Sequence, residues 1–526
     1  MRLVFHNGRI HTQHQGLITD SIVVDGSQIV AVGFDLHRSP EFKSYAKHNL
    51  RGKSIIPGLT DAHTHFLYFA LSYNRVIVEG ATSIVACQRT IKEFCKGKGK
   101  DEWIVGEGFS PDNFKVRSEP NRFDLDAVTG GRPAFIFSKD NHTAWVNSEA
   151  LRLAGISKKT PDVAGGEIVR ESEGNPTGLL REHPAYIPVY DLIPRPTTSV
   201  IDSCYPKALG HAYRRGVTSV HSFDQNHLFP YYERRAERKS MGLRVNFYFR
   251  SEGLADVVKS RIRFGTGDEF LRVAGIKIFA DGTIGSQTAL CFKPYIGGGK
   301  NCGIAVTPVK EMIRLGREAA KLGLPCAVHA IGDKAVSNVL DAFEKIPALP
   351  PGARHRIEHI QLIRRADINR MRRLGVTASM QPSHCASDIA MIQKYWKNRQ
   401  KDAYLFRTID ESGIPLAFGS DVPIEPLDPL AGIASAMTRK KRGARDVFMP
   451  KERMTALRAL HAFTAGAAYA VGQENCRGHL LPGFPADFVV IDGDISRMPA
   501  VKLYKSPVLA TFLDGKQVFA DSDFRL

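Results

Sequence analysis

The stretch IIPGLTDAHTHFLY, residues 55 to 68, predicts a strand that ends in two closely spaced histidines. An apolar run from Ile55 to Leu59 leads to His63 and His65. Side chains two apart on an extended strand point to the same side, so two imidazoles would converge where this strand ends. The chain holds 18 histidines, and chance alone supplies about 0.6 pairs of this spacing. The pair therefore indicates a metal site only if further ligands come from other parts of the chain. Otherwise the two histidines are ordinary polar residues at the start of a loop.

Downstream of this stretch, apolar strand-like runs alternate with segments of helical length. Stretches such as VKEMIRLGREAAKLG repeat apolar residues at the i, i+3 and i+4 spacing of amphipathic helices. With the opening strand there are eight strand-like runs, and the other seven are GVTSVHSFD (216–224), LRVNFYFR (243–250), VAGIKIFADG (273–282), LPCAVHAIGD (324–333), HRIEHIQLI (355–363), GVTASMQP (375–382) and PLAFGSD (415–421). Eight strands separated by helices predict an α/β fold, a parallel (β/α)₈ TIM barrel.

Both chain ends carry short β-branched runs broken by Asn-Gly and Asp-Gly, which are typical of hairpins. We expect residues 1–56 and 476–526 to form one small β-sandwich domain. The first barrel strand is placed at 57–66 and the remainder of the barrel at 201–475. Because the gap after the first strand is too long for one helix, residues 67–200 are predicted to be an insertion beside the active-site face, where they would supply a lid.

Composition narrows the possible partners and compartment. The formal net charge is +18 and the pI about 9.5, but the basic residues are dispersed and lack interleaved aromatic residues. We therefore expect a solvated basic surface and no nucleic-acid partner. The sequence has no Cys-x-x-Cys, no apolar run of membrane-spanning length, and no apolar core of a signal peptide at its start. These features predict a cytoplasmic protein with no membrane partner.

Potential ligands recur at the carboxyl ends of the predicted strands, where barrel active sites are assembled. A single histidine in a strand is more often a core residue, and an aspartate in a turn often caps a helix. The common placement at strand ends instead favours a site for zinc or a similar divalent ion. The residues at these ends are His63 and His65 on the first strand, Lys277 on the fourth, His329 on the fifth, His359 on the sixth and Asp421 on the eighth.

Lys277 is the unusual member of this set, because lysine is rarely buried without a partner. It shares one strand face with Asp281, and an ion pair between the two is the reading that spacing alone favours. Burial would lower the pKa of Lys277 and leave a neutral amine. A neutral amine adds carbon dioxide to form a carbamate, an anionic ligand that bridges two metals.

Several motifs together resemble the amidohydrolase superfamily, specifically its N-substituted formamide deformylase-like branch of metal-dependent hydrolases. They are PGLTDAHTH, GIKIFADGTIGSQTA, AVHAIGDKAV, RIEHIQ, FGSDVPIEPLDPL and LLPGFPADFVVID, and segments of the insertion are also similar, so the resemblance covers essentially the whole chain. The resemblance implies a (β/α)₈ barrel with a terminal β-sandwich. It also implies that Lys277 is carbamylated and bridges two metal ions. This implication replaces the ion pair with Asp281 that spacing alone favours. The metal ligands that it implies are His63, His65, Lys277, His329, His359 and Asp421.

The function implied is hydrolysis of a carbon–nitrogen bond in a small-molecule amide, formamide or cyclic amide. One or two divalent ions, zinc being the expected metal, would supply a hydroxide that attacks the carbonyl, with Asp421 as proton carrier. His142 is the candidate for holding the carbonyl or its oxyanion, or else a loop histidine bonded to backbone. Asp281 and Gln381 are weaker candidates for substrate contact that could instead tie strands together.

Two alternatives remain open at the level of sequence. The first is a deaminase or an esterase on the same barrel; related deaminases usually place a Glu three residues after the fifth-strand histidine, where this chain has Gly332. The second is a non-catalytic scaffold member, which would be expected to have lost ligands, whereas all six positions are filled here. Because members of the family it resembles are often dimers, we expect a homodimer. The sequence does not identify the substrate.

Overall fold

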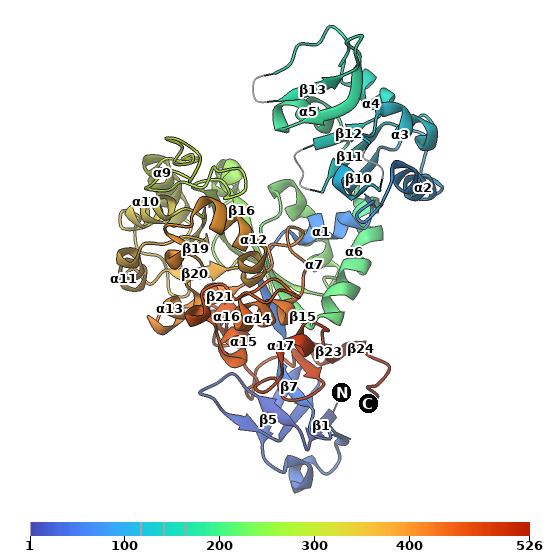
Figure 1. The fold of residues 1–526 in the computed structure, drawn as a ribbon. Helices are drawn as coiled ribbons and strands as arrows, with labels where there is room; N and C mark the ends of the chain where they lie inside the picture. Colours follow the sequence, from blue (N-terminus) through green and yellow to red (C-terminus); the bar gives the residue numbers. More distant parts are fainter. Residues whose placement is uncertain (1, 116–117, 140–142, 164–165) are drawn as a thin grey trace. The chain divides into compact units, whose positions relative to one another are not determined.

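The computed structural model describes residues 2–115, 118–139, 143–163 and 166–526, and the chain divides into two compact units. The larger unit contains an eight-stranded parallel sheet (Figure 1). Its strands, in order around the sheet, are β8 (Leu59–Thr64), β15 (Val217–Ser222), β16 (Arg244–Arg250), β17 (Leu271–Phe279), β18 (Cys326–Ala330), β19 (Arg356–His359), β20 (Thr377–Met380) and β21 (Leu416–Phe418). A parallel bridge between Thr64 and Val422 joins the two edges, so the sheet forms a TIM-type barrel, as predicted.

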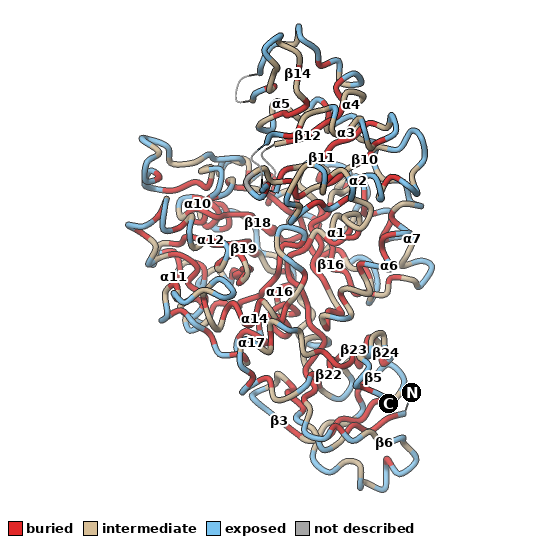
Figure 2. The backbone as a smooth tube through the Cα atoms, turned by 45° about the vertical axis from the view of Figure 1, so that its right-hand side comes forward, coloured by how far each residue is buried: buried red, intermediate tan, exposed pale blue. Residues whose placement is uncertain are grey.

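Helices follow the strands and cover the outside of the barrel. In α10 the apolar residues Val336, Val339, Leu340 and Phe343 recur at i, i+3, i+4 and i+7, and all are buried. Figure 2 shows buried residues along strands such as β18 and β19, whose residues are buried on both faces as expected for parallel strands. The helices are α7 (Phe229–Glu237), α8 (Leu254–Lys259), α9 (Val309–Ala320), α10 (Asp333–Phe343), α11 (Arg365–Arg373), α12 (Pro382–Tyr395), α13 (Phe406–Glu411), α14 (Pro429–Thr438), α15 (Ala456–Ala462) and α16 (Ala465–Ala470).

The strand expected over residues 55–65 is two strands in the structure. β7 (Ser54–Pro57) pairs with β22 (Phe488–Ile491) of another sheet, whereas β8 (Leu59–Thr64) begins the barrel. The division falls at Gly58, where a Cβ would lie 2.2 Å from Oγ1 of Thr218. Only glycine allows this close approach of the two strands. The apolar run continues through the change of sheet, which is why the sequence pattern did not mark it.

The N-terminal segment alone forms one further sheet and shares a second with the C-terminal segment, and the termini lie beside each other (Figure 1). The rings of Phe5, Phe488 and Phe512 join the two sheets in one apolar core, with centroids 4.4 to 5.6 Å apart. One sheet consists of β5 (Gln28–Gly33), β4 (Ser21–Asp25), β1 (Arg2–His6) and β6 (Ala46–Asn49). The other consists of β24 (Lys516–Ala520), β23 (Val508–Leu513), β22 (Phe488–Ile491), β7, β2 (Arg9–His11) and β3 (Ile18–Thr19).

The second compact unit spans Ala70–Lys207 and contains a mixed six-stranded sheet that the sequence did not predict. Apolar cores cover both faces: Phe135 and Val146 belong to one cluster, Ile136 and Trp145 to the other. The strands in order are β13 (Glu167–Arg170), β14 (Pro176–Arg181), β12 (Thr143–Val146), β11 (Ala134–Ser138), β10 (Ile104–Phe109) and β9 (Val76–Ile77), with helices α2 (Ile84–Cys95), α3 (Arg122–Thr129), α4 (Ser148–Leu153) and α5 (His183–Tyr190). Within the described part of the chain, no helix combines the length and apolarity needed to span a bilayer.

Candidate metal centre

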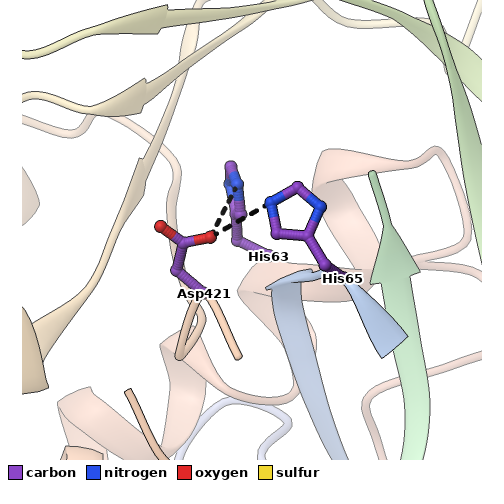
Figure 3. Close-up of side chains that lie close together, drawn as sticks. All are labelled: His63, His65 and Asp421. Atoms are coloured by element: carbon purple, nitrogen blue, oxygen red, sulfur yellow. Dashed lines mark ion pairs between the residues drawn. The ribbon is translucent and has the colours of Figure 1, made fainter. Parts of the chain in front are cut away.

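Two histidines and one aspartate converge at the carboxyl end of the barrel strands (Figure 3). Nε2 of His63 lies 3.5 Å from Oδ1 of Asp421, and Nε2 of His65 lies 3.4 Å from the same oxygen. Two ligands held about 2.1 Å from a tetrahedral ion are about 3.4 Å apart, so these spacings fit a shared divalent cation. The donor set of two imidazoles and one carboxylate also suits zinc.

Backbone hydrogen bonds hold these side chains in position. The N–H of Asp421 donates to the carbonyl of His63 (2.7 Å), and the N–H of His65 donates to the carbonyl of Val422 (2.9 Å). These bonds fix the segment after β21 against the end of β8. Asp421 has a φ of 64°, a left-handed conformation that aspartate and asparagine adopt more readily than most residues. The local backbone therefore directs the carboxylate toward both imidazoles.

Hydrogen bonds at one ring nitrogen leave the other nitrogen of each histidine available. Nδ1 of His63 lies 2.7 Å from Oε2 of Glu358, and Nδ1 of His65 lies 3.1 Å from the carbonyl of Phe223. Such partners orient a metal-binding imidazole and fix its tautomer. In both residues Nε2 is the nitrogen that faces Asp421.

His329 and His359 extend the cluster. The ring centroid of His359 lies 4.9 Å from that of His63 and 4.5 Å from that of His329. Nδ1 of His359 is paired with Oε1 of Gln381 at 2.9 Å, whereas Nε2 of His329 is paired with the carbonyl of Gly282 at 3.1 Å. Each ring again has one anchored nitrogen and one that is free for another partner.

Burial and neighbouring charges set the protonation of the cluster. Burial, reinforced by Lys277, lowers the pKa of His63 to about 4 and that of His329 to about 3. Burial and the neighbouring His329 hold the pKa of His359 well below its usual range. For Asp421 burial alone would raise the pKa, but the facing imidazoles outweigh it and keep the pKa well below normal. Neutral imidazoles beside an ionised carboxylate are the protonation state that binds a metal.

Lys277 is buried in β17 with only 1% of its surface exposed. Burial lowers its pKa to about 8, although the carboxylates of Glu358 and Asp421 act in the opposite direction. Its Nζ lies 4.7 Å from the ring centroid of Phe223 and 5.0 Å from that of Phe279. A substantial fraction of this amine is therefore neutral near pH 8, as carbamate formation requires.

The three residues predicted to contact substrate differ in what the structure shows of their surroundings. Asp281 does not pair with Lys277; its carboxylate accepts backbone N–H bonds of 2.8 to 3.0 Å and connects the loop after β17 to the end of β18. Burial raises the pKa of Asp281 to about 7. Gln381 is buried beside His359, and its Nε2 has no hydrogen-bond partner among the described residues. His142 lies outside the described residues.

Three residues of this centre were missed by sequence reasoning. Arg356 and Glu358 are fully buried on β19 and form an ion pair of 2.6 Å beneath His63. The sequence does contain a signal for this pair. Two charged residues two apart on an apolar strand point to the same side, and buried charges require partners. His384, in the first turn of α12, has its Nε2 3.8 Å from Oδ2 of Asp421.

Comparisons with known proteins give consistent results. A family model described as "Amidohydrolase family" matches residues 48–519. The Bacillus subtilis (strain 168) protein YtcJ is 31% identical over 99% of this chain and 100% of its own length. The N-substituted formamide deformylase of Arthrobacter pascens is 24% identical over 94% of each chain. The crystal structure of an uncharacterized metal-dependent hydrolase from Pyrococcus furiosus has a TM-score of 0.81 and 28% identity, covering 94% of this chain and 100% of that one.

Proposed function

Because the chain belongs to the amidohydrolase family, we propose that it is a metal-dependent hydrolase that cleaves a carbon–nitrogen bond in a small-molecule amide, formamide or cyclic amide. One observation carries this proposal: Nε2 of His63 and Nε2 of His65 converge on one oxygen of Asp421 at separations typical of ligands on a single ion. Two relatives support the reaction class by name, one as a formamide deformylase and one as a metal-dependent hydrolase.

We assign the binding of one or two divalent ions, with zinc as the expected metal, to the cluster at the strand ends. When bound, such an ion polarises a carbonyl oxygen and lowers the pKa of a water molecule to near 7, so that water attacks at neutral pH. The neutral histidines supply nitrogen donors and Asp421 supplies a charged oxygen. The proposed ligands are His63, His65, Lys277, His329, His359 and Asp421.

Lys277 acts in this proposal as a carbamate. Its neutral amine forms an N–C bond to carbon dioxide and releases one proton from Nζ, which turns the side chain into an anion. The burial of Lys277 and its lowered pKa support this reaction, because the protonated amine cannot attack carbon dioxide. The resulting carboxylate adds a negative charge next to a group of neutral imidazoles.

Asp421 moves the proton during hydrolysis. Its ionised carboxylate takes a proton from the attacking water as the carbon–oxygen bond forms. The same proton then passes to the leaving nitrogen as the carbon–nitrogen bond breaks, which gives a carboxylic acid and an amine. The backbone bond from the N–H of Asp421 to the carbonyl of His63 holds the carboxylate in place for both steps.

Metal removal tests the proposal directly. The purified protein is expected to contain a divalent metal by elemental analysis and to hydrolyse at least one member of a panel of N-formyl, N-acyl and cyclic amides. Dialysis against a chelator should abolish hydrolysis, and added zinc should restore it. The panel should include amino-substituted heterocycles and esters, with separate detection of amine, ammonia and alcohol. Release of ammonia or alcohol alone would replace amide hydrolysis with deamination or ester cleavage, and absence of bound metal under every loading condition would overturn the proposal.

Replacing Glu358 with Gln is expected to weaken metal binding by about 10- to 100-fold, because a hydrogen-bonding partner of a ligand is impaired. Glu358 accepts from Nδ1 of His63 and also neutralises the buried Arg356. The variant should also unfold at a lower temperature, because removing one partner of a buried ion pair costs about 3–5 kcal/mol. Chelator competition and thermal unfolding measure the two effects.

The matched control is Glu452→Gln, which changes a buried glutamate that is bonded to the N–H of Thr408 outside the cluster. It is expected to affect stability and leave metal affinity unchanged. If Glu358→Gln bound metal as tightly as the wild-type protein, Glu358 would have no role in orienting His63.

A further inference from the structure

The carboxylate of Asp421 has two oxygens, and the imidazoles of His63 and His65 both face the same one. Both contacts converge on Oδ1, while the second oxygen points away from the two rings (Figure 3). The second oxygen, Oδ2, lies 3.8 Å from Nε2 of His384. This distance is too long for a hydrogen bond. It exceeds by only a few tenths of an ångström the spacing of about 3.4 Å between two ligands of a tetrahedral ion.

His384 presents an unpartnered nitrogen to this position. The residue is only 9% exposed, and its Nε2 is enclosed with no hydrogen-bond partner among the described residues. A buried polar atom without a partner is uncommon in folded proteins and calls for an explanation such as an ion that the structure does not contain. The rings of His384 and His359 are nearly parallel, 17° apart, with centroids separated by 6.1 Å.

His359 completes this second group. Because its Nδ1 is bonded to Gln381, its Nε2 is the nitrogen available for a further partner. One ligand atom from each of His359, His384 and Asp421 lies within 4.8 Å of the other two, and all three residues are buried. This group and the one formed by His63, His65 and Asp421 share only the carboxylate.

We infer that His384 is a metal ligand and that Asp421 bridges two cation positions, one on each carboxylate oxygen. His63 and His65 contribute to the first cation position with Oδ1, while His359 and His384 contribute to the second with Oδ2. Lys277 and His329 remain ligands of the same centre, as proposed above. This inference rests on the proposed metal centre and adds a ligand from α12, outside the strand ends. The first turn of α12 thereby becomes part of the cation site.

Metal titration of the full-length protein tests this inference without measuring turnover. The metal-free wild-type protein is expected to bind two Co²⁺ ions, measured by calorimetry and by elemental analysis after gel filtration. His384→Ala should retain one ion and lose the other. Ser383→Ala, a change at the adjacent position of α12, should bind two. Circular dichroism and thermal unfolding establish that each variant is folded.

A cysteine substitution provides a spectroscopic test of direct ligation. His384→Cys places a thiol at the proposed ligand position, and its Co²⁺ complex should show a thiolate-to-cobalt charge-transfer absorption in the near ultraviolet that the wild-type complex lacks. Ser383→Cys adds a thiol one residue away and should show no such band. The difference spectrum against the wild-type protein removes any contribution from the eight native cysteines.

The outcomes separate this inference from the proposed function. A wild-type protein that binds no divalent ion refutes both. Two ions in both the wild-type protein and His384→Ala, without the charge-transfer band in His384→Cys, overturn the role of His384 and leave the hydrolase proposal intact. One ion in the wild-type protein overturns the bridging arrangement. Loss of one ion in His384→Ala, together with the new band in His384→Cys, supports it.

Discussion

Replacing Asp421 with Asn is expected to reduce the turnover number by about 10²- to 10⁴-fold, the range that removal of a general acid–base group typically produces. The asparagine amide has nearly the same shape but cannot accept the proton of the attacking water or deliver it to the leaving nitrogen. The backbone should tolerate the change, because asparagine readily adopts the left-handed conformation found at this position, with φ of 64°. Steady-state kinetics on the amide identified by the panel measures the effect.

Metal content must be measured on the same preparation, because Asp421 is also a proposed ligand. The amide oxygen can still coordinate a cation, so metal at saturating concentration is expected to remain bound while hydrolysis is lost. Asp367→Asn is the matched control: Asp367, on α11, is buried and paired with Arg364, away from the cluster. It should lower stability and leave turnover unchanged. Wild-type turnover in metal-loaded Asp421→Asn would remove the proton-carrier role.

Much of the barrel was predictable because parallel strands and their helices have different periodicities. Each of the seven runs predicted after the opening strand coincides with one barrel strand, for example β18 (Cys326–Ala330) within residues 324–333, although β17 (Leu271–Phe279) begins before the run predicted at 273–282. The resemblance drawn from the motifs is confirmed by the family match over residues 48–519. The change of sheet at Gly58 was not predictable, because apolar residues suit the interior of both sheets equally well.

The candidate site was predictable only where a proposed ligand lies at a strand end. His63 and Asp421 satisfy this condition, and their side chains lie together as the topology of a parallel barrel requires. His384 does not, because it lies in the first turn of α12, where a histidine has no characteristic spacing to the other proposed ligands. The ion pair of Arg356 and Glu358 was not predicted, because the sequence alone does not show that these two charged side chains, on the same strand as His359, are buried against each other.

Replacing Lys277 with Ala is expected to remove metal and abolish turnover. The loss of metal affinity should exceed the roughly 10- to 100-fold that follows removal of a ligand's hydrogen-bonding partner, since Lys277 is proposed to bind directly. The substitution also leaves a space beside Phe223 and Phe279, whose rings now flank the amine. A short carboxylic acid such as formate or acetate would place a carboxylate in that space. Added formate should therefore restore part of both the metal content and the turnover.

Lys277→Met is the control that makes this rescue specific. Methionine has a similar length and fills the same space, but it cannot form a carbamate and leaves no room for an added acid. It should lack metal both with and without formate, while remaining folded because its side chain packs against the rings of Phe223 and Phe279 that now flank the amine. Electron density for a carbamate on Lys277 would be direct support, since the adduct is labile in mass spectrometry. Neither alanine nor methionine at position 277 can supply an anionic oxygen. Full metal content in either variant without added acid would therefore show that Lys277 is not a ligand.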